Sequence, residues 1–401
     1  MYQQSRGQDA QLADTAAPVS QARPSDELLP FLNNFHDIFT TIGVLILFTG
    51  LGLGAGQLYQ SIAPEEGGFS QEALILSLLF GVGLVAFVLS AILVGRQRRI
   101  LPGIVLSLVF VGCISVVLIW LYTRLTIALN GGQSLEPAFD VLGEIEEPTR
   151  AAFQAALGEL SIVVRVFPVI AGLIVSAVIA FYYSRFRLPF SAGLLGVALA
   201  TTAAALLAII DPYSFVIWNP TVSLSLGLAL FAAGIVFDAR DPERTTRLSG
   251  AGFWFHFFAA PTLLGAAVTI ANLGWTYSEA DFEAGQAAGL MGAWIIGDEA
   301  AAMRSAVATL IVIGAFALVS LLINRRALIV AGLITAGIAT AALVSQLGLG
   351  VGTVIAVTLL LLGGVVVLLG AAWNPVRSIL VAPFPRSGPL ARIIPPVNHE
   401  G

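Results

Sequence analysis

The chain is poor in the side chains that build most protein chemistry. It has no lysine, a single cysteine and three histidines among its 401 residues. Because Cys113 has no second cysteine to pair with, a disulfide within the chain is excluded. His36, His256 and His399 are the only imidazoles, so a zinc site built from cysteine and histidine is not expected. The sequence therefore predicts no metal, no other cofactor and no catalytic residues.

Charged residues are also scarce. Charged residues make up 11% of the chain and hydrophobic residues 57%, whereas a soluble domain has about 25% charged residues. The apolar residues occur in runs of roughly 20, the length of a helix that crosses a bilayer. The net charge of −5 argues against a nucleic-acid partner. The composition thus predicts an all-α, polytopic transmembrane helix bundle whose first partner is the lipid bilayer.

Ten apolar runs are candidates for membrane spans. Residues 1–30 are polar and predict a disordered cytoplasmic tail. Residues 31–376 are expected to form the bundle, and residues 377–401 a second cytoplasmic tail. The ten expected spans cover about 38–60, 73–95, 101–123, 161–183, 189–210, 221–237, 251–273, 305–323, 327–347 and 351–372.

Two acidic connections, 125–160 and 274–304, are expected to be loops on the outer side of the membrane, away from the cytoplasm. Apolar residues three or four apart around 135–142 and 153–160 predict two short amphipathic helices on the membrane surface. Residues 284–297 are apolar but too short to span the bilayer. Either a surface helix or a re-entrant segment fits them.

The arginines predict the direction of the spans. Cytoplasmic loops of membrane proteins are enriched in positive charge. With a cytoplasmic amino terminus, ten spans leave only Arg124, Arg150 and Arg304 outside. This distribution favours ten spans with both termini cytoplasmic, and one span more or fewer would invert the later connections. The arginines predicted inside, beyond the first span, are Arg96, Arg98, Arg99, Arg185, Arg187, Arg240, Arg244, Arg247, Arg325, Arg326, Arg377, Arg386 and Arg392.

Two weaker patterns concern close contacts between helices and an internal repeat. Glycines at alternate positions from 50 to 56 form overlapping Gly-xxx-Gly pairs, which permit close contact between helices. Residues 192–201 resemble residues 331–340, which predicts a parallel internal repeat of the kind common in transporters. A chance match between alanine-rich helices is the alternative.

His256 is the most unusual residue inside a predicted span. It lies a few residues into the seventh span, among five aromatic residues and a little over one turn before Pro261. An ionisable side chain at membrane depth is by default a candidate for function, and an imidazole exchanges a proton near neutral pH. Because the position is close to the cytoplasmic headgroups, a structural, hydrogen-bonded histidine is the alternative.

The connection before this span, residues 238–247, carries both signs of charge. Arg240, Arg244 and Arg247 could bind an anionic lipid headgroup or a membrane-protein partner. The same arginines could instead fix the topology and pair with neighbouring acids, as Glu243 and Arg247 would at a spacing of four. The sequence leaves both interpretations open, and it does not settle the oligomeric state.

Three further candidates lie toward the opposite side. Arg165 is the deepest arginine, and it fits either an interfacial anchor or a gate or anion site beside the break at Pro168. Asp298 and Glu299, with Arg304, form a cluster at the mouth of the eighth span. Solvated charge is the alternative for that cluster.

Two short segments carry a family resemblance. They are Phe-Trp-Phe-His-Phe-Phe-Ala-Ala-Pro, residues 253–261, and Gly-Ala-Ala-Trp-Asn-Pro-Val-Arg, residues 370–377. With the hydropathy layout, they resemble a family of uncharacterised polytopic inner-membrane proteins of Gram-negative bacteria. The resemblance implies a multi-pass location in a bacterial inner membrane and no known activity, and it assigns no functional residue.

Two classes of function fit these observations. The ten spans, the repeat and the glycine-rich helices favour a permease-like or channel-like protein for a small solute. The alternative is a non-transporting structural or sensory membrane partner, or an enzyme on lipid-linked substrates at the cytoplasmic leaflet. No predicted span centre carries a carboxylate, which counts against a proton-driven pump of the usual kind.

Overall fold

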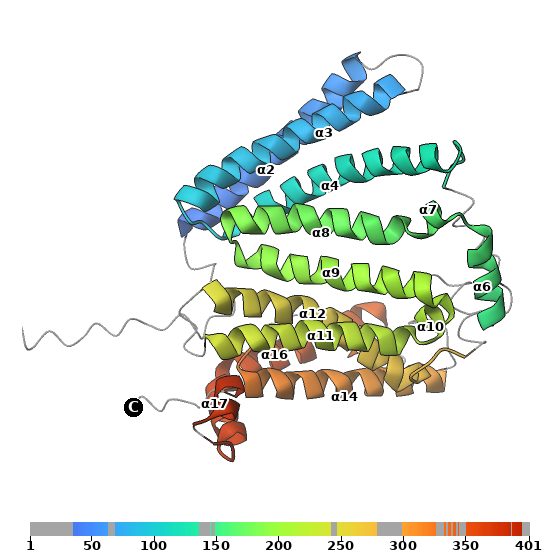
Figure 1. Cartoon of the computed structure of the whole chain (residues 1–401). Helices are drawn as coiled ribbons and strands as arrows, with labels where there is room; N and C mark the ends of the chain where they lie inside the picture. The colour runs from blue at the N-terminus through green and yellow to red at the C-terminus, as the bar shows by residue number, and fades with distance from the viewer. Residues whose placement is uncertain are drawn as a thin grey trace, which may run out of the picture.

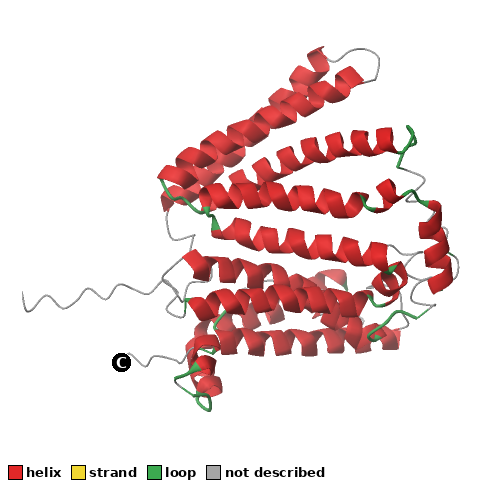
Figure 2. Ribbon diagram, viewed as in Figure 1, coloured by secondary structure: helices red, strands yellow, loops and turns green. Residues whose placement is uncertain are grey.

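The structure is a computed structural model of the chain. Every regular element in its described residues is a helix, and no strand occurs there (Figures 1 and 2). The predicted all-α fold is therefore confirmed for this part of the chain. The described residues are 35–62, 69–135, 145, 149–241, 247–278, 299–325, single positions between 333 and 344, 350–385 and 387–394.

Among the described residues, seven helices are long and apolar enough to cross a membrane. They match the first seven predicted spans in order, which supports membrane insertion. They are Phe35–Ile62 (α2), Gln71–Arg96 (α3, Phe69–Ser90, with the π-helix η2, Ala91–Arg96), Leu101–Leu129 (α4), Phe167–Phe186 (α8), Pro189–Ile210 (α9), Asn219–Arg240 (α11) and Gly250–Leu273 within α12 (Arg247–Leu273).

The last three predicted spans are described in part. The eighth lies in α14 (Glu299–Ile323) and the tenth in α16 (Val351–Val381), whose two halves meet at 55° and would make an eighth crossing. Most of the ninth, 327–347, lies outside the described residues. The total of ten spans therefore stays a prediction. So do the statements about residues 1–30, 284–297 and 331–340, which lie wholly or mostly outside the described residues.

The long helices lie side by side and run in alternating directions. In Figure 1 they form a row from α2 and α3 at the top, through α4, α8 and α9, to α11, α12 and α14. α12 is the most enclosed, because 56% of its apolar stretch is buried, against 11–28% in the other six helices. It packs against α9, α11 and α14. Much of α12 is therefore shielded from the surroundings of the bundle.

The arginine-rich turns lie together at one end of this row, on the left in Figure 1. This end holds the turns between η2 and α4 and between α8 and α9, the last residues of α11, and the start of the turn after α14. The described arginines that the sequence predicts on opposite sides of the membrane therefore lie at opposite ends of the bundle. The arginines in these turns and helix ends are Arg96, Arg98, Arg99, Arg185, Arg187, Arg240 and Arg325, whereas Arg124, Arg150 and Arg165 belong to the other end.

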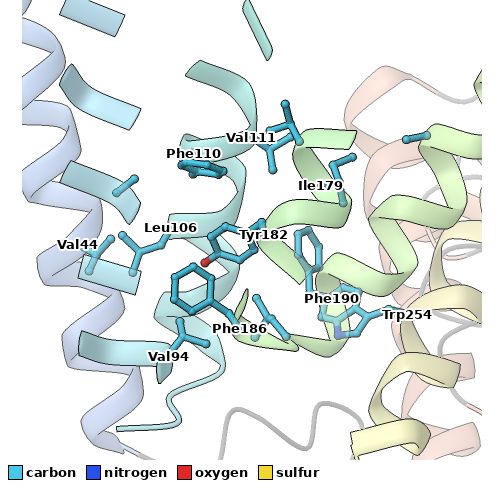
Figure 3. Packing of buried hydrophobic residues seen from close by; sticks show 14 of the residues in the cluster. Val44, Val94, Leu106, Phe110, Val111, Ile179, Tyr182, Phe186, Phe190 and Trp254 are labelled. Carbon is cyan, nitrogen blue, oxygen red and sulfur yellow. The ribbon is translucent and has the colours of Figure 1, made fainter. Parts of the chain in front are cut away.

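Aromatic and aliphatic side chains fill the space between α4, α8, α9 and α12 (Figure 3). Leu106 and Tyr182 are fully buried there, and Trp254 is 8% exposed. The Tyr182 hydroxyl lies 2.9 Å from Oγ of Ser90. Since lipid is as apolar as this core, close packing holds such helices together. At Gly196 the approach is so close that a Cβ atom would lie 2.4 Å from the ring of Phe255.

The glycines at positions 50 to 56 of α2 behave differently. Among the described residues, no atom of a neighbour lies within 4 Å of a Cβ built at any of them. The predicted close helix contact at these glycines is therefore not observed in this part of the chain. α2 packs on its neighbours through Val44, and Arg99 donates to the carbonyl of His36 at 2.9 Å and to the Thr40 hydroxyl at 2.6 Å.

In the described part of the chain, three short helices cover the opposite end: α6 (Arg150–Glu159), α7 (Ile162–Arg165) and α10 (Pro212–Ile217). The Thr149 hydroxyl caps α6 by accepting a hydrogen bond from the amide of Ala152 at 3.2 Å. One face of α6 is buried and the other exposed, which confirms the predicted amphipathic helix around 153–160. Most of the one predicted around 135–142 lies outside the described residues.

Asp211 links α6 to α10. Its carboxylate accepts hydrogen bonds from the amide and hydroxyl of Ser214, at 3.1 and 2.7 Å, and from Arg150 at 2.7 Å. The bonds from Ser214, followed by the contact with Arg150, hold the pKa of Asp211 below its ordinary value of 3.8. The stabilisation is therefore present above the ordinary pKa, and it is lost as pH falls through the lowered value.

We expect Asp211→Asn to speed hydrogen exchange at the α10 amides at neutral pH, because the neutral amide is a weaker acceptor for Arg150 and Ser214. In the natural protein, exchange at these amides should become faster at acid pH, where Asp211 is protonated. The variant should lack this increase. Exchange measured by mass spectrometry and corrected for the intrinsic rate at each pH checks both effects. Equal protection of α10 in the two proteins would contradict the assignment.

Candidate functional site

A charged cluster lies inside the arginine-rich end of the bundle. Asp238 is on α11, His256 is on α12, and Arg325 follows α14. The Arg325 guanidinium donates to both carboxylate oxygens of Asp238, with Nε 2.9 Å from Oδ2. Nε2 of His256 lies 3.1 Å from the same Oδ2. We call these three residues the charged cluster. Their side chains are only 12%, 0% and 9% exposed.

The Asp238 carboxylate determines which imidazole nitrogen of His256 carries the proton. Both oxygens of Asp238 accept hydrogen bonds from Arg325, so the carboxylate acts as an acceptor toward His256 as well. His256 therefore donates from Nε2–H. The ring of Phe231 packs edge-to-face on the imidazole, with the ring centres 4.8 Å apart.

Two glycines make room for the cluster. Gly234 lies four residues before Asp238 on α11, and Gly252 lies four residues before His256 on α12. Residues four apart share one face of a helix, so Gly234 of α11 faces His256 of α12, and Gly252 of α12 faces Asp238 of α11. A Cβ atom at Gly234 would lie 2.8 Å from the His256 ring, and one at Gly252 would lie 2.2 Å from Oδ1 of Asp238. We call this arrangement the paired glycine notch.

A tight turn after α14 directs Arg325 toward Asp238. Asn324 has a φ of 54°, in the left-handed region that asparagine tolerates better than most residues. The amide of Arg325 then donates to the carbonyl of Ser320 at 3.0 Å, which is the hydrogen bond of a Schellman motif. The Ser320 hydroxyl also donates to the Arg325 carbonyl. The chain thus turns back at the end of α14 instead of continuing the helix.

The same turn binds α16. Trp373 donates from Nε1 to the side-chain oxygen of Asn324 at 3.1 Å, and Arg377 donates from Nε to the carbonyl of Leu321 at 3.1 Å. Trp373 and Arg377 are 3% and 5% exposed. Four helices, α11, α12, α14 and α16, are therefore joined around the charged cluster by polar contacts.

Comparisons of the chain with protein-family models, with curated protein sequences and with solved structures find no match. The family resemblance of residues 253–261 and 370–377 stays a prediction.

The energetics of the cluster are informative. Transfer of a charged group from water into a protein interior costs several kcal/mol even when the group is paired, and apolar residues of similar volume often hold a bundle as well. Stabilisation of the fold is therefore a weak explanation for the charged cluster. Charged side chains that can separate and become hydrated suit a part of a protein that opens and closes. Because the His256 side chain is fully buried, no substrate reaches the imidazole in this conformation.

Of the residues predicted to carry function, only His256 belongs to the charged cluster. Arg240 is exposed at the last position of α11. Arg165 lies at the other end of the bundle and donates to the carbonyl of Leu160 at 2.7 Å. The remaining predicted roles are not tested, because Arg244, Asp298 and the side chains of Arg247 and Glu299 lie outside the described residues.

Neither Asp238, which contacts His256, nor Arg325, which contacts Asp238, is predicted from the sequence to form a site with His256. In the sequence, Asp238 belongs to a charged connection and Arg325 bears only on the topology. One signal was present, since a glycine precedes both Asp238 and His256 by four residues at facing ends of consecutive spans. Arg325 had no comparable signal, because it is 87 positions from Asp238 in the chain.

Proposed function

We propose that the chain is a permease-like, multi-pass protein of a bacterial inner membrane that moves a small solute, and that the charged cluster is a gate at one end. In this proposal the chain crosses the membrane ten times with both termini cytoplasmic, so the gate faces the cytoplasm. The observation that carries the proposal is the Asp238 carboxylate, which is bonded to both His256 and Arg325. The three residues come from three separate helical segments.

A gate of this kind uses the reversibility of ion pairs. When the pairs separate, water that enters the opening solvates the charges and offsets much of the lost attraction. Closed and open states then differ by little free energy, so a bound solute can shift the balance between them. An apolar contact offers no comparable gain from water, because wetting apolar surface is unfavourable.

The packing around the cluster is consistent with such a separation. Among the described residues, the apolar cluster between α12 and α14 is small, with Ala260 and Ile323 as its buried members and Phe231 and Phe316 packed against them. The contact between α11 and α12 is far more extensive. We infer that α14 moves away from the α11–α12 hairpin when the gate opens.

Thiol labelling tests the gate. Cys113→Ser removes the only cysteine, and Ala260→Cys then adds a reporter at a fully buried position one turn deeper than His256. We expect a water-soluble maleimide to label this reporter slowly when the cluster is intact. Arg325→Gln should raise the rate about tenfold, as a shift of about 1.4 kcal/mol toward the open state would.

Ala86→Cys is the matched control, because Ala86 is equally buried but lies on α3, away from the cluster. Its labelling should stay slow with and without Arg325→Gln. Faster labelling at both positions would mean general loosening of the fold. An unchanged rate at Ala260→Cys would refute the gate.

One observation favours a non-transporting membrane partner as the second candidate. Only 11% of the apolar stretch of α2 is buried, the smallest share among the seven described membrane-length helices, so this helix leaves a wide apolar face for lipid or for another membrane protein. Labelling that never reaches Ala260→Cys in any variant, combined with copurification of a second membrane protein through α2, would favour this function over the permease.

A further inference from the structure

A second site lies at the end of the bundle opposite the charged cluster. A partly open cavity of about 140 Å³ is bounded by the short helices α6 and α7, the start of α8 and the end of α9. These elements meet on the right in Figure 1. Its lining is apolar apart from one guanidinium, and includes Leu157, Val164, Arg165, Phe167, Ala208 and Ile209.

Arg165 is anchored at the wall of this cavity. Its Nε donates to the carbonyl of Leu160 at 2.7 Å, and its Nη2 donates to the carbonyl of Gly158 at 3.2 Å. These carbonyls end α6, so the guanidinium caps that helix and is held in a fixed orientation. Among the described residues Arg165 forms no ion pair with a carboxylate, and its Nη1 has no hydrogen-bond partner.

We propose that this cavity binds one acyl chain of an anionic phospholipid, with the lipid phosphate on the free side of the Arg165 guanidinium. The two halves of the site match the two halves of such a lipid. The apolar lining offers no hydrogen bond to a polar solute, and the single fixed cation offers one to a phosphate. Arginine near a membrane interface also reaches readily toward headgroups.

The size of the cavity suits a short length of hydrocarbon. An apolar cavity of about 150 Å³ in another protein accepts a benzene ring, so about 140 Å³ has room for the part of an acyl chain nearest the headgroup. The amphipathic helix α6, with Phe153 and Leu157 buried and its other face exposed, lies over this end as a helix at a membrane interface does.

Lipid binding to the purified full-length protein tests the site. The probes are phosphatidylglycerol and the phosphate-free diacylglycerol with identical acyl chains, titrated into the detergent-solubilised protein and counted as bound lipid by native mass spectrometry. We expect phosphatidylglycerol to bind about tenfold more tightly, the effect of one charge-assisted hydrogen bond at about 1.4 kcal/mol. Arg165→Gln should abolish this preference and leave the binding of the diacylglycerol unchanged.

A second variant tests the acyl-chain half of the site without touching the guanidinium. Ala208→Leu places a larger side chain in the cavity and should weaken the binding of both lipids severalfold. Its matched control is Ala203→Leu, which enlarges an exposed position of the same helix. Arg124→Gln is the control for charge, because Arg124 lies at the same end but is paired with Glu72.

The outcomes separate clearly. Equal affinity for the two lipids in the natural protein, or a preference that survives Arg165→Gln, overturns the phosphate assignment. Binding that survives Ala208→Leu overturns the acyl-chain assignment. If Arg165→Gln does not fold, Ala208→Leu still decides whether a lipid occupies the cavity. Because the site is remote from the charged cluster, none of these results depends on the gate.

Discussion

Replacement of Asp238 by asparagine is expected to lower the free energy of unfolding by about 3–5 kcal/mol, the usual cost of removing one partner from a buried ion pair. The variant keeps the shape of the side chain but removes its charge. Arg325, whose side chain is 9% exposed, would then hold a positive charge away from water without its carboxylate. Thermal or denaturant unfolding of the purified protein in detergent measures the loss.

Asp211→Asn is the control for this substitution, because it removes the same charge from a carboxylate at the more accessible, opposite end of the bundle. It should change the unfolding midpoint far less. The double variant Asp238→Leu with Arg325→Met should recover part of the loss, since it leaves no unpaired charge but removes the acceptor of the buried His256 Nε2–H. A wild-type midpoint for Asp238→Asn would show that the cluster does not hold the helices together.

The second large effect is expected at the paired glycine notch. Gly252→Ala adds a Cβ atom that would lie 2.2 Å from Oδ1 of Asp238, so the carboxylate or the helix must move. Overpacking of this kind costs about 1–3 kcal/mol, and displacement of Asp238 also weakens its bonds to His256 and Arg325. We therefore expect Gly252→Ala both to destabilise the protein and to speed the labelling of Ala260→Cys.

Gly265→Ala is an internal control on the same helix, because no atom of a described neighbour lies within 4 Å of a Cβ built there. A glycine in a helix interior costs roughly 0.5–1 kcal/mol relative to alanine, so this variant should be neutral or slightly more stable. Paired unfolding curves of Gly252→Ala and Gly265→Ala make the comparison. Equal midpoints would mean that α11 and α12 tolerate a wider separation than the notch implies.

The part of the fold that follows from local sequence was predictable. Runs of roughly 20 apolar residues can satisfy their backbone hydrogen bonds in lipid only as helices or closed barrels, and the run lengths indicated seven of the described helices. The arginines indicated which turns share an end of the bundle. The amphipathic pattern of Phe153, Ala156 and Leu157 likewise indicated α6.

The site was less predictable, because its contacts join distant parts of the chain. His256 stood out as an ionisable residue in an apolar span, but its carboxylate partner lies 18 positions away and the arginine 87 positions from that carboxylate. Hydropathy gives the order of helices along the chain, not which faces meet. The direction of Arg325 depends on the left-handed turn at Asn324, a local feature that hydropathy does not reveal.

The paired glycine notch also determines which parts of the bundle can travel together. With His256 seated over Gly234 and Asp238 over Gly252, neither α11 nor α12 can slide or roll on the other without a steric clash. The two helices therefore form one rigid body, and the bonds of Trp373 and Arg377 couple α16 to α14 as another. In the proposed gate the plane of separation runs between Asp238 and Arg325, while the hydrogen bond from His256 to Asp238 persists in both states.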